Sequence, residues 1–199
     1  MIAIPIMKAL AMPNSDAVDG AAPADGVALR VLSAADAEEA LPRLGALLAD
    51  VVASGASVNF MHGFSAADAA RFWRGQLALI AEGQRILIVA MRGDDIVGTV
   101  VVTFAHQPNQ PHRADIGKML VHSSMRRRGL GRRLLTAAEG AASAAGRTLL
   151  VLDTETGSAG HALYAACGWT EVGTIPGYAL TPDGRPSGAT IFYKEIAGA

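Results

Sequence analysis

The 199-residue chain lacks features that define several classes of protein. It has one cysteine, so an intrachain disulfide is impossible and a reducing, cytoplasmic location is predicted. Only 5% of its residues are aromatic and its formal net charge is −1, so neither nucleic acid nor an anionic membrane is expected as a partner. No apolar run approaches the roughly 18 residues of a membrane span. Its five histidines show no metal-ligand spacing, so no metal is predicted.

What the chain does contain is enough apolar residues, 51% of the total, for one domain of ordinary size. A domain of roughly 150 residues buries about 68–70% of its unfolded surface, so it needs neither a metal nor a disulfide. Residues 1–25, where Pro5 and Pro13 interrupt short apolar stretches, are predicted to form a flexible N-terminal tail. We expect residues 26–199 to form the folded domain.

Regular signals for strands and helices begin near residue 26. Ser33 precedes Asp36, and Ser65 precedes Asp68, in the spacing of a helix capping box. The apolar stripe after the first box extends to residue 53. This half of the chain is therefore predicted to contain a strand at 27–32, a helix to residue 53, a helix from 65 to 83, and strands at 85–91 and 96–104.

The second half predicts a strand–helix–strand unit over residues 114–121, 130–145 and 148–153. A crossover of this length makes the two strands parallel neighbours, and the unbroken apolar run at 148–153 is typical of a strand buried on both faces. A short helix at 159–167 and two strands, at 169–173 and 189–196 around a Pro- and Gly-rich loop, complete a mixed sheet with helices on its faces.

The turn between the first strand and helix of this unit has the features of an anion site. It reads Arg126-Arg127-Arg128-Gly129-Leu130-Gly131-Arg132. The free N–H groups of a first helical turn and the positive end of the helix dipole attract phosphate, and the glycines permit a close approach. Its spacing fits neither a dinucleotide fingerprint nor a phosphate-binding loop that ends in Gly-Lys-Ser/Thr. The purely structural alternative is an ordinary helix start whose arginine side chains are solvated and bind no ligand.

Arg126-x-x-Gly129-x-Gly131 after ADIGKMLV, followed by TLLVLD and a short helix with Tyr164, resembles the GNAT superfamily of N-acyltransferases. The resemblance covers residues 26–197. It implies a single-domain α/β fold with a mixed, mostly antiparallel sheet, whose central parallel pair splays to admit coenzyme A. It also implies acetyl-coenzyme A as cosubstrate, with contacts from Met119, Leu120, Val121, Arg126, Arg127, Arg128, Gly129, Leu130, Gly131, Arg132, Ser158 and Tyr164.

More narrowly, the run from LLVLDTETGS to TPDG resembles the tabtoxin-resistance type of acetyltransferase, which acetylates a small amino-acid-like amine. The chain departs from that type at two positions. Asp115 stands where the type has Glu, and Gly117 stands where it has Gln.

Acyl transfer to an amine needs a base for the ammonium, donors for the carbonyl oxygen and an acid for the departing thiolate. Asp115 and Asp153 lie on the two parallel strands, at the edge where ligands of such sheets bind, and are the candidate bases. The resemblance implies Tyr164 as the acid and the backbone N–H groups around Leu120 and Val121 as the donors. Because no thiol or hydroxyl has an evident base partner, direct attack in a ternary complex is favoured.

Each of these residues also has a purely structural reading. Asp153 can be a turn former, Asp115 can pair with Arg113 or Lys118, and Tyr164 can be a core residue. The candidate acceptor-binding residues are Phe72, Trp73, Asp115, Asp153 and Tyr178, of which Tyr178 is expected in the loop before the last strand.

The sequence therefore predicts an acetyl-coenzyme A-dependent N-acetyltransferase for a small-molecule primary amine, acting as a monomer or homodimer. Three alternatives stay open. One is acetylation of a peptide or protein amine, and the second is a non-catalytic coenzyme A sensor. The third, a nucleic-acid binder built on the arginines, would need a wider basic face with interleaved aromatic residues.

Overall fold

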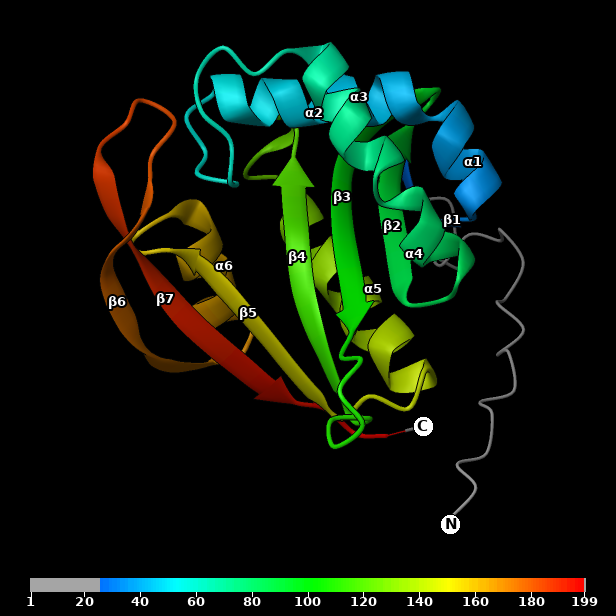
Figure 1. Cartoon of the computed structure of the whole chain (residues 1–199), viewed down its shortest axis with the longest axis vertical. Coiled ribbons are helices and arrows are strands. Elements are labelled where there is room, and N and C mark those ends of the chain that lie inside the picture. Colours follow the sequence, from blue (N-terminus) through cyan, green and yellow to red (C-terminus); the bar gives the residue numbers. More distant parts are fainter. Residues whose placement is uncertain (1–25, 199) are drawn as a thin grey trace.

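The computed structural model describes residues 26–198, in which seven strands form one sheet in the order β1-β2-β3-β4-β5-β7-β6 (Figure 1). All neighbouring strands are antiparallel except β4 and β5, which are parallel. The elements are β1 (Val27–Leu32), α1 (Ala34–Glu39), α2 (Leu41–Ala53), α3 (Ala66–Arg74), α4 (Leu77–Ala81), β2 (Arg85–Arg92), β3 (Asp95–Phe104), β4 (Arg113–Val121), a 3-10 turn (Ser123–Met125), α5 (Leu130–Ala144), β5 (Leu149–Glu155), α6 (Ala159–Ala166), β6 (Thr170–Leu180) and β7 (Pro186–Glu195).

The predicted fold class is confirmed: a mixed, mostly antiparallel sheet has a parallel β4–α5–β5 unit at its centre and helices on both faces. The predicted tail at residues 1–25 lies outside the described residues. No helix within residues 26–198 is long and apolar enough to cross a membrane.

Two hydrophobic clusters lie on opposite faces of the central strands. Along β2, Ile88 joins the cluster beneath α5, whereas its neighbours Leu87 and Val89 join the cluster beneath α1 to α4. All three side chains are fully buried. Since successive side chains of a strand point to opposite faces, a strand segment covered on both sides must be apolar at every position, as β2 is from Ile86 to Met91.

Both predicted capping boxes are present. The side chains of Ser33 and Ser65 accept hydrogen bonds from the backbone N–H groups of Asp36 and Asp68, each at 3.1 Å. The predicted continuity of the two helices is wrong, because each is divided into two. Pro42 lies in the first turn of α2, a position that suits proline. Because proline has no N–H to donate, it cannot continue the hydrogen bonding of the preceding helix, and α2 begins as a separate helix.

The second predicted helix, at 65–83, divides at Gly75 and Gln76, between α3 and α4. Glycine is the weakest helix former after proline, so a break costs least at this point. The division leaves α3 free to pack closely across α2, where Gly45 leaves room for the backbone of α3. A Cβ at Gly45 would lie 2.6 Å from the carbonyl oxygen of Ala66. The Nε1 atom of Trp73 donates to the Leu44 carbonyl across the same contact at 3.1 Å.

The C-terminal strands differ from the prediction in two ways. β5 is buried on one face only: Leu150 and Leu152 are buried, whereas Leu149 and Val151 are half-buried. This corrects the expectation of burial on both faces, because the helices α1 to α4 do not extend over β5. The strand predicted at 169–173 continues to residue 180 as β6, so Tyr178 lies in a strand and not in a loop.

Candidate active site

The centre of the sheet opens between its two parallel strands. β4 and β5 pair at only three positions, the last being Asp115 with Val151, and beyond this point they diverge (Figure 1). From Ile116 onward, β4 therefore has a strand partner only on its β3 side. The gap exposes one edge of β4 over the stretch that includes Met119, Leu120 and Val121, whose amides were predicted to contact the cofactor.

A bulge in β4 lies beside this gap. Lys118 has a φ of +45°, and the register with β3 shifts between Thr99 and Val101. The fully buried hydroxyl of Thr99 donates to the Lys118 carbonyl at 2.9 Å. This hydrogen bond satisfies a carbonyl that the regular ladder cannot reach, and so stabilises the bulge.

The turn after β4 leads into the N-terminus of α5, which no side chain caps. Arg127 and Gly129 both have positive φ, of 59° and 80°. Since the first amides of a helix have no partner within it, the N–H groups of Leu130, Gly131 and Arg132 are available to an anion. The predicted anion-binding turn thus has the backbone conformation that this role requires.

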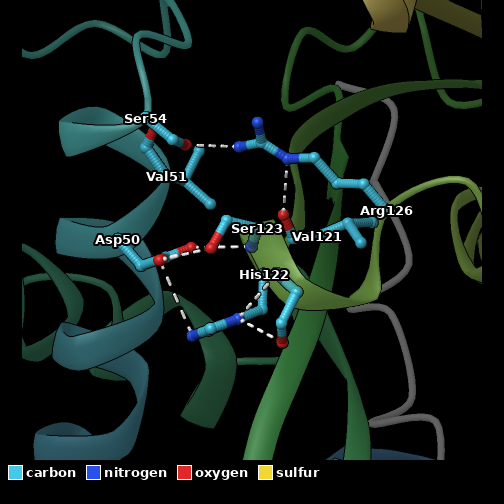
Figure 2. Close-up of polar contacts among 8 residues, drawn as sticks. Asp50, Val51, Ser54, Val121, His122, Ser123 and Arg126 are labelled. Carbon is cyan, nitrogen blue, oxygen red and sulfur yellow. Dashed lines mark hydrogen bonds and ion pairs between the residues drawn. The ribbon is translucent and has the colours of Figure 1, made fainter.

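Asp50 of α2 holds this turn through two hydrogen bonds. The backbone N–H and the hydroxyl of Ser123 each donate to its carboxylate at 2.8 Å (Figure 2). His122 Nε2 lies 3.7 Å from the same carboxylate, and its Nδ1 lies 2.9 Å from the Ser124 hydroxyl. No sequence pattern indicated Asp50, because it lies 73 residues from Ser123 along the chain.

The arginines of the turn divide into two groups. The guanidinium of Arg126 donates to the Ser54 hydroxyl and, at 3.4 Å, to the Val121 carbonyl (Figure 2), and that of Arg132 donates to the Ala166 carbonyl of α6. These two side chains therefore connect the turn to α2 and α6. Arg127 and Arg128 are exposed and remain available to a phosphate.

The two candidate bases lie on the same face of the sheet. Asp115 is registered with Val151, and Asp153 follows two residues further along β5, so both side chains point to the side that carries α1 to α4. Arg113 Nη1 donates to Asp115 at 3.0 Å, the ion pair weighed from the sequence. Asp153 is exposed on its strand, beside the gap.

Tyr164 of α6 is 5% exposed and packs against Trp169 and Phe192, with ring centroids 5.8 and 6.1 Å apart. Burial raises the pKa of its hydroxyl above the usual value, and the negative charges of Asp153 and Cys167 add to the shift. The hydroxyl therefore stays protonated beyond the pH at which an exposed tyrosine ionises. Asp153 of β5 and Tyr164 of α6, the helix that packs on β5, both lie on the β5 side of the opening between β4 and β5.

A cavity of about 270 Å³ lies on the α3 side of β3 and β4. Phe72 and Trp73 form part of its wall, together with Arg85 and Lys118. Trp73 is also a core residue, since it is 1% exposed. Sequence analysis missed Arg85 and considered Lys118 only as a partner of Asp115, because no motif marks either residue.

The remaining predicted residues have evident structural roles. Ser158 caps α6 by accepting from the His161 N–H at 3.1 Å. Tyr178 is 55% exposed on β6 and is not among the described residues that line the cavity. Leu120 is buried in the cluster beneath α1 to α4, and Met119 and Val121 contact the opposite cluster. Residues 26–198 contain no group of three or more His, Cys, Asp or Glu side chains placed to hold a metal.

Comparison with known proteins agrees with this architecture. A model of the acetyltransferase (GNAT) family matches residues 53–169, more than half of the chain. RimL, a ribosomal L7/L12 alpha-N-protein acetyltransferase solved in complex with coenzyme A, is 16% identical, with a TM-score of 0.73 over 92% of this chain and 100% of its own.

Two further structures are similar. yncA from Salmonella typhimurium, solved with its cofactor acetyl-CoA, is 16% identical, with a TM-score of 0.68 over 87% of this chain and 96% of its own. A candidate phosphinothricin N-acetyltransferase is 20% identical, with a TM-score of 0.70 over 86% of this chain and 99% of its own. Identities this low show a shared fold and leave the substrate open.

Proposed function

The chain belongs to the acetyltransferase (GNAT) family, and from this premise we propose that it transfers an acetyl group from acetyl-coenzyme A to the primary amine of a small molecule. The observation that carries the proposal is the seam between β4 and β5. These strands pair at three positions and then part, beside the uncapped N-terminus of α5. The candidate base Asp153 of β5 and the candidate acid Tyr164 of α6 belong to the β5 side of that gap.

The residues present fit the cosubstrate. The free amides of the first turn of α5 and the exposed Arg127 and Arg128 suit a pyrophosphate, which carries two anionic groups. The unpaired edge of β4 offers backbone groups to an extended arm, as an open strand edge does. When bound, acetyl-coenzyme A supplies an acyl group activated as a thioester.

The chain's own side chains would then move the protons. Asp153, with Asp115 beside it, would hold the acceptor ammonium and take its proton, directly or through water. The Tyr164 hydroxyl, kept protonated by burial, would donate to the departing thiolate. Backbone N–H groups near Leu120 and Val121 would polarise the acyl carbonyl. Since Cys167 lies half-buried beyond α6 with no base partner described for it, attack by the amine itself is favoured over a covalent enzyme intermediate.

Two features favour a small acceptor over a peptide or protein amine. The cavity of about 270 Å³ is the size of a small molecule. In addition, the end of the β6–β7 hairpin closes against the segment between α2 and α3. The His62 N–H donates to the Pro182 carbonyl at 2.9 Å, and the Ser57 hydroxyl donates to the Leu180 carbonyl at 3.4 Å. This contact restricts the path by which a protein segment could reach the cavity.

The narrower proposal is the tabtoxin-resistance type of acetyltransferase, acting in the cytoplasm as a monomer or homodimer. The resemblance of residues 149–184 to that type supports it, and so does the single cysteine. The fold similarity to RimL keeps protein N-terminal acetylation as the alternative that the test must separate.

Thiol release from acetyl-coenzyme A tests the proposal, with amino acids, amines, aminoglycosides and short peptides as acceptors. Coenzyme A binding is followed in parallel by calorimetry. Release with small amines but not with peptides is the expected result. Release with peptides alone would replace the proposal by the protein-directed function. Tight coenzyme A binding without release from any acceptor would favour the non-catalytic sensor.

A further inference from the structure

We propose that Arg85 and Lys118 form an anion-binding subsite in the acceptor cavity, and that it holds a carboxylate of the acceptor. The inference rests on the proposed function, because the subsite is a wall of the cavity in which that function places the acceptor. It adds a chemical requirement that the amine alone does not impose: the acceptor carries a negative group besides its amine.

The charged side chains described around the cavity are all positive. Among the described residues that line it, the only charged side chains are those of Arg85 and Lys118, and no carboxylate is present. The two side chains come from β2 and β4, with β3 between them. Placing two half-buried like charges around one small cavity is unfavourable unless an anion compensates them. A carboxylate that enters the cavity would provide this compensation.

Arg85 lines the cavity and has a hydrogen-bond donor for which the described residues supply no acceptor. Its Nη1 donates to the Gln76 side-chain oxygen, and the Gln76 amide donates to the Phe72 carbonyl at 3.1 Å. Its Nε is buried and has no hydrogen-bond partner within residues 26–198. Burial lowers the pKa of the guanidinium. A buried donor without a partner is costly in a folded protein, and a bound anion would satisfy it.

Lys118 is positioned by the bulge in β4. Its Nζ lies 5.4 Å from the ring centroid of Phe72 and 5.8 Å from that of Phe60, which confines the ammonium without neutralising it. Burial lowers its pKa, the negative charge of Asp153 opposes this shift, and the positive charge of Arg85 adds to it. Asp153 and Arg85 therefore act on the Lys118 ammonium in opposite directions.

Positive and negative groups lie on different parts of the site. Asp115 and Asp153 follow the seam with β5, whereas Arg85 and Lys118 lie toward α3. This layout suits a zwitterion, whose ammonium faces the carboxylates while its carboxylate faces the cations. It disfavours polyamines and aminoglycosides, because these carry several positive charges and no negative one.

The test compares matched acceptors. The twenty common L-amino acids and their carboxamides are assayed with the full chain by thiol release from acetyl-coenzyme A. We expect kcat/KM for the best acid to exceed that for its carboxamide by roughly tenfold or more, the effect of one hydrogen bond to a charged group. Equal or better use of the carboxamides would overturn the proposal.

Variants then assign the preference to these residues. Lys118→Gln removes the charge at similar length, and we expect it to lower kcat/KM for the acid about tenfold while changing that for the carboxamide less than threefold. Lys118→Arg keeps the charge and serves as the matched control, so it should retain the preference. Equal losses with acid and carboxamide in Lys118→Gln would show that Lys118 is merely structural and would overturn the proposal.

A measurement without turnover separates this proposal from the proposed function. Lys118 is labelled with acetic anhydride, and its modification is followed by peptide mass spectrometry, with Lys194 as the internal reference. N-acetyl-L-methionine should slow labelling of Lys118 at least threefold more than its carboxamide does, and should leave Lys194 unaffected. Equal protection by both compounds would overturn the anion subsite. If no amine is acetylated yet this protection is seen, the proposed function fails and the subsite stands.

Discussion

Helices cover β2 and β3 on both faces along most of their length, whereas β5 buries side chains on one face only and no residue of β6 is buried. In the first arm, made of β1 to β4, the clusters beneath α5 and beneath α1 to α4 bury β2 and β3 except at their ends. In the second arm, no described residue of β5, β6 or β7 belongs to the cluster beneath α1 to α4. β6 exposes apolar side chains, with Val172 at 65% and Tyr178 at 55%.

The contrast shows where a site can form in this fold. A doubly covered sheet has no free surface for a ligand, and a one-sided hairpin has little core with which to hold side chains rigidly. The seam between β4 and β5 combines both properties. One wall is the rigid first arm, and the other wall is a strand whose outer face is open. The candidate catalytic residues lie at this boundary, and the cavity lies next to it, on the α3 side of β3 and β4.

The largest expected effect is on turnover, and it comes from a substitution beside the seam between β4 and β5. Tyr164→Phe removes one hydroxyl from a buried ring, and if that hydroxyl protonates the thiolate, kcat should fall about 10²- to 10⁴-fold. Binding of acetyl-coenzyme A should change less than threefold, because the ring still packs against Trp169 and Phe192. Turnover is measured by thiol release across pH, and binding by calorimetry. A variant with unchanged turnover at every pH would remove Tyr164 from the mechanism.

A pair of truncations compares the stability that each arm contributes. Leu134→Ala creates a cavity beneath β3 and should lower the free energy of unfolding by about 3 kcal/mol, since Leu134 is fully buried. Val172→Ala on β6 should change it by less than about 0.5 kcal/mol, because that side chain is already in solvent. Urea unfolding of both variants gives the two values. Similar losses at the two positions would contradict the contrast between the arms.

Alkaline pH sharpens the comparison by testing the burial of Tyr164. Its pKa in the folded state lies above the unfolded value of about 10, so the unfolded chain loses this proton first as pH rises. The stabilisation is complete below pH 10 and decreases above it by about 1.4 kcal/mol per pH unit until the folded pKa is passed. Urea unfolding at pH 9, 10 and 11 should show this slope in excess over Tyr164→Phe. Parallel curves for the two proteins would mean that the hydroxyl is not buried in solution.

The smallest effect concerns the link between α2 and the turn that begins α5. Asp50→Asn keeps the shape of the side chain but removes its charge, since the amide oxygen can accept from the Ser123 N–H and the NH₂ group can donate to the Ser123 hydroxyl, so two charge-assisted hydrogen bonds become neutral ones. The Kd for coenzyme A should rise about fivefold, equivalent to about 1 kcal/mol, while kcat changes less than twofold. Asp183→Asn, the same change in the β6–β7 turn, is the matched control for calorimetry. An unchanged Kd would show that the turn keeps its shape without Asp50.

Much of the fold could be predicted because its signals are local. The serine–aspartate capping boxes, the apolar runs of β2 and β3 and the crossover length of the parallel unit act within a few residues to a few tens of residues. The predictions were wrong where contacts between residues distant in the sequence determine the burial or the length of a strand. β5 reads as a strand buried on both faces, yet the open seam leaves Val151 half-buried and Asp153 exposed. Tyr178 reads as a loop residue, yet its strand continues because β7 pairs with it.

The candidate site shows the same division. The sequence by itself determined where the glycines, arginines and helix start of the predicted anion-binding turn lie, since they are adjacent in the chain, and it placed Asp115, Asp153 and Tyr164 on the elements around that turn. Only the tertiary structure brought Asp50 to Ser123, connected Arg126 to α2, and placed Arg85 beside Lys118 in one cavity. The physical reason is that charge acts through space, whereas a sequence pattern shows only neighbours along the chain.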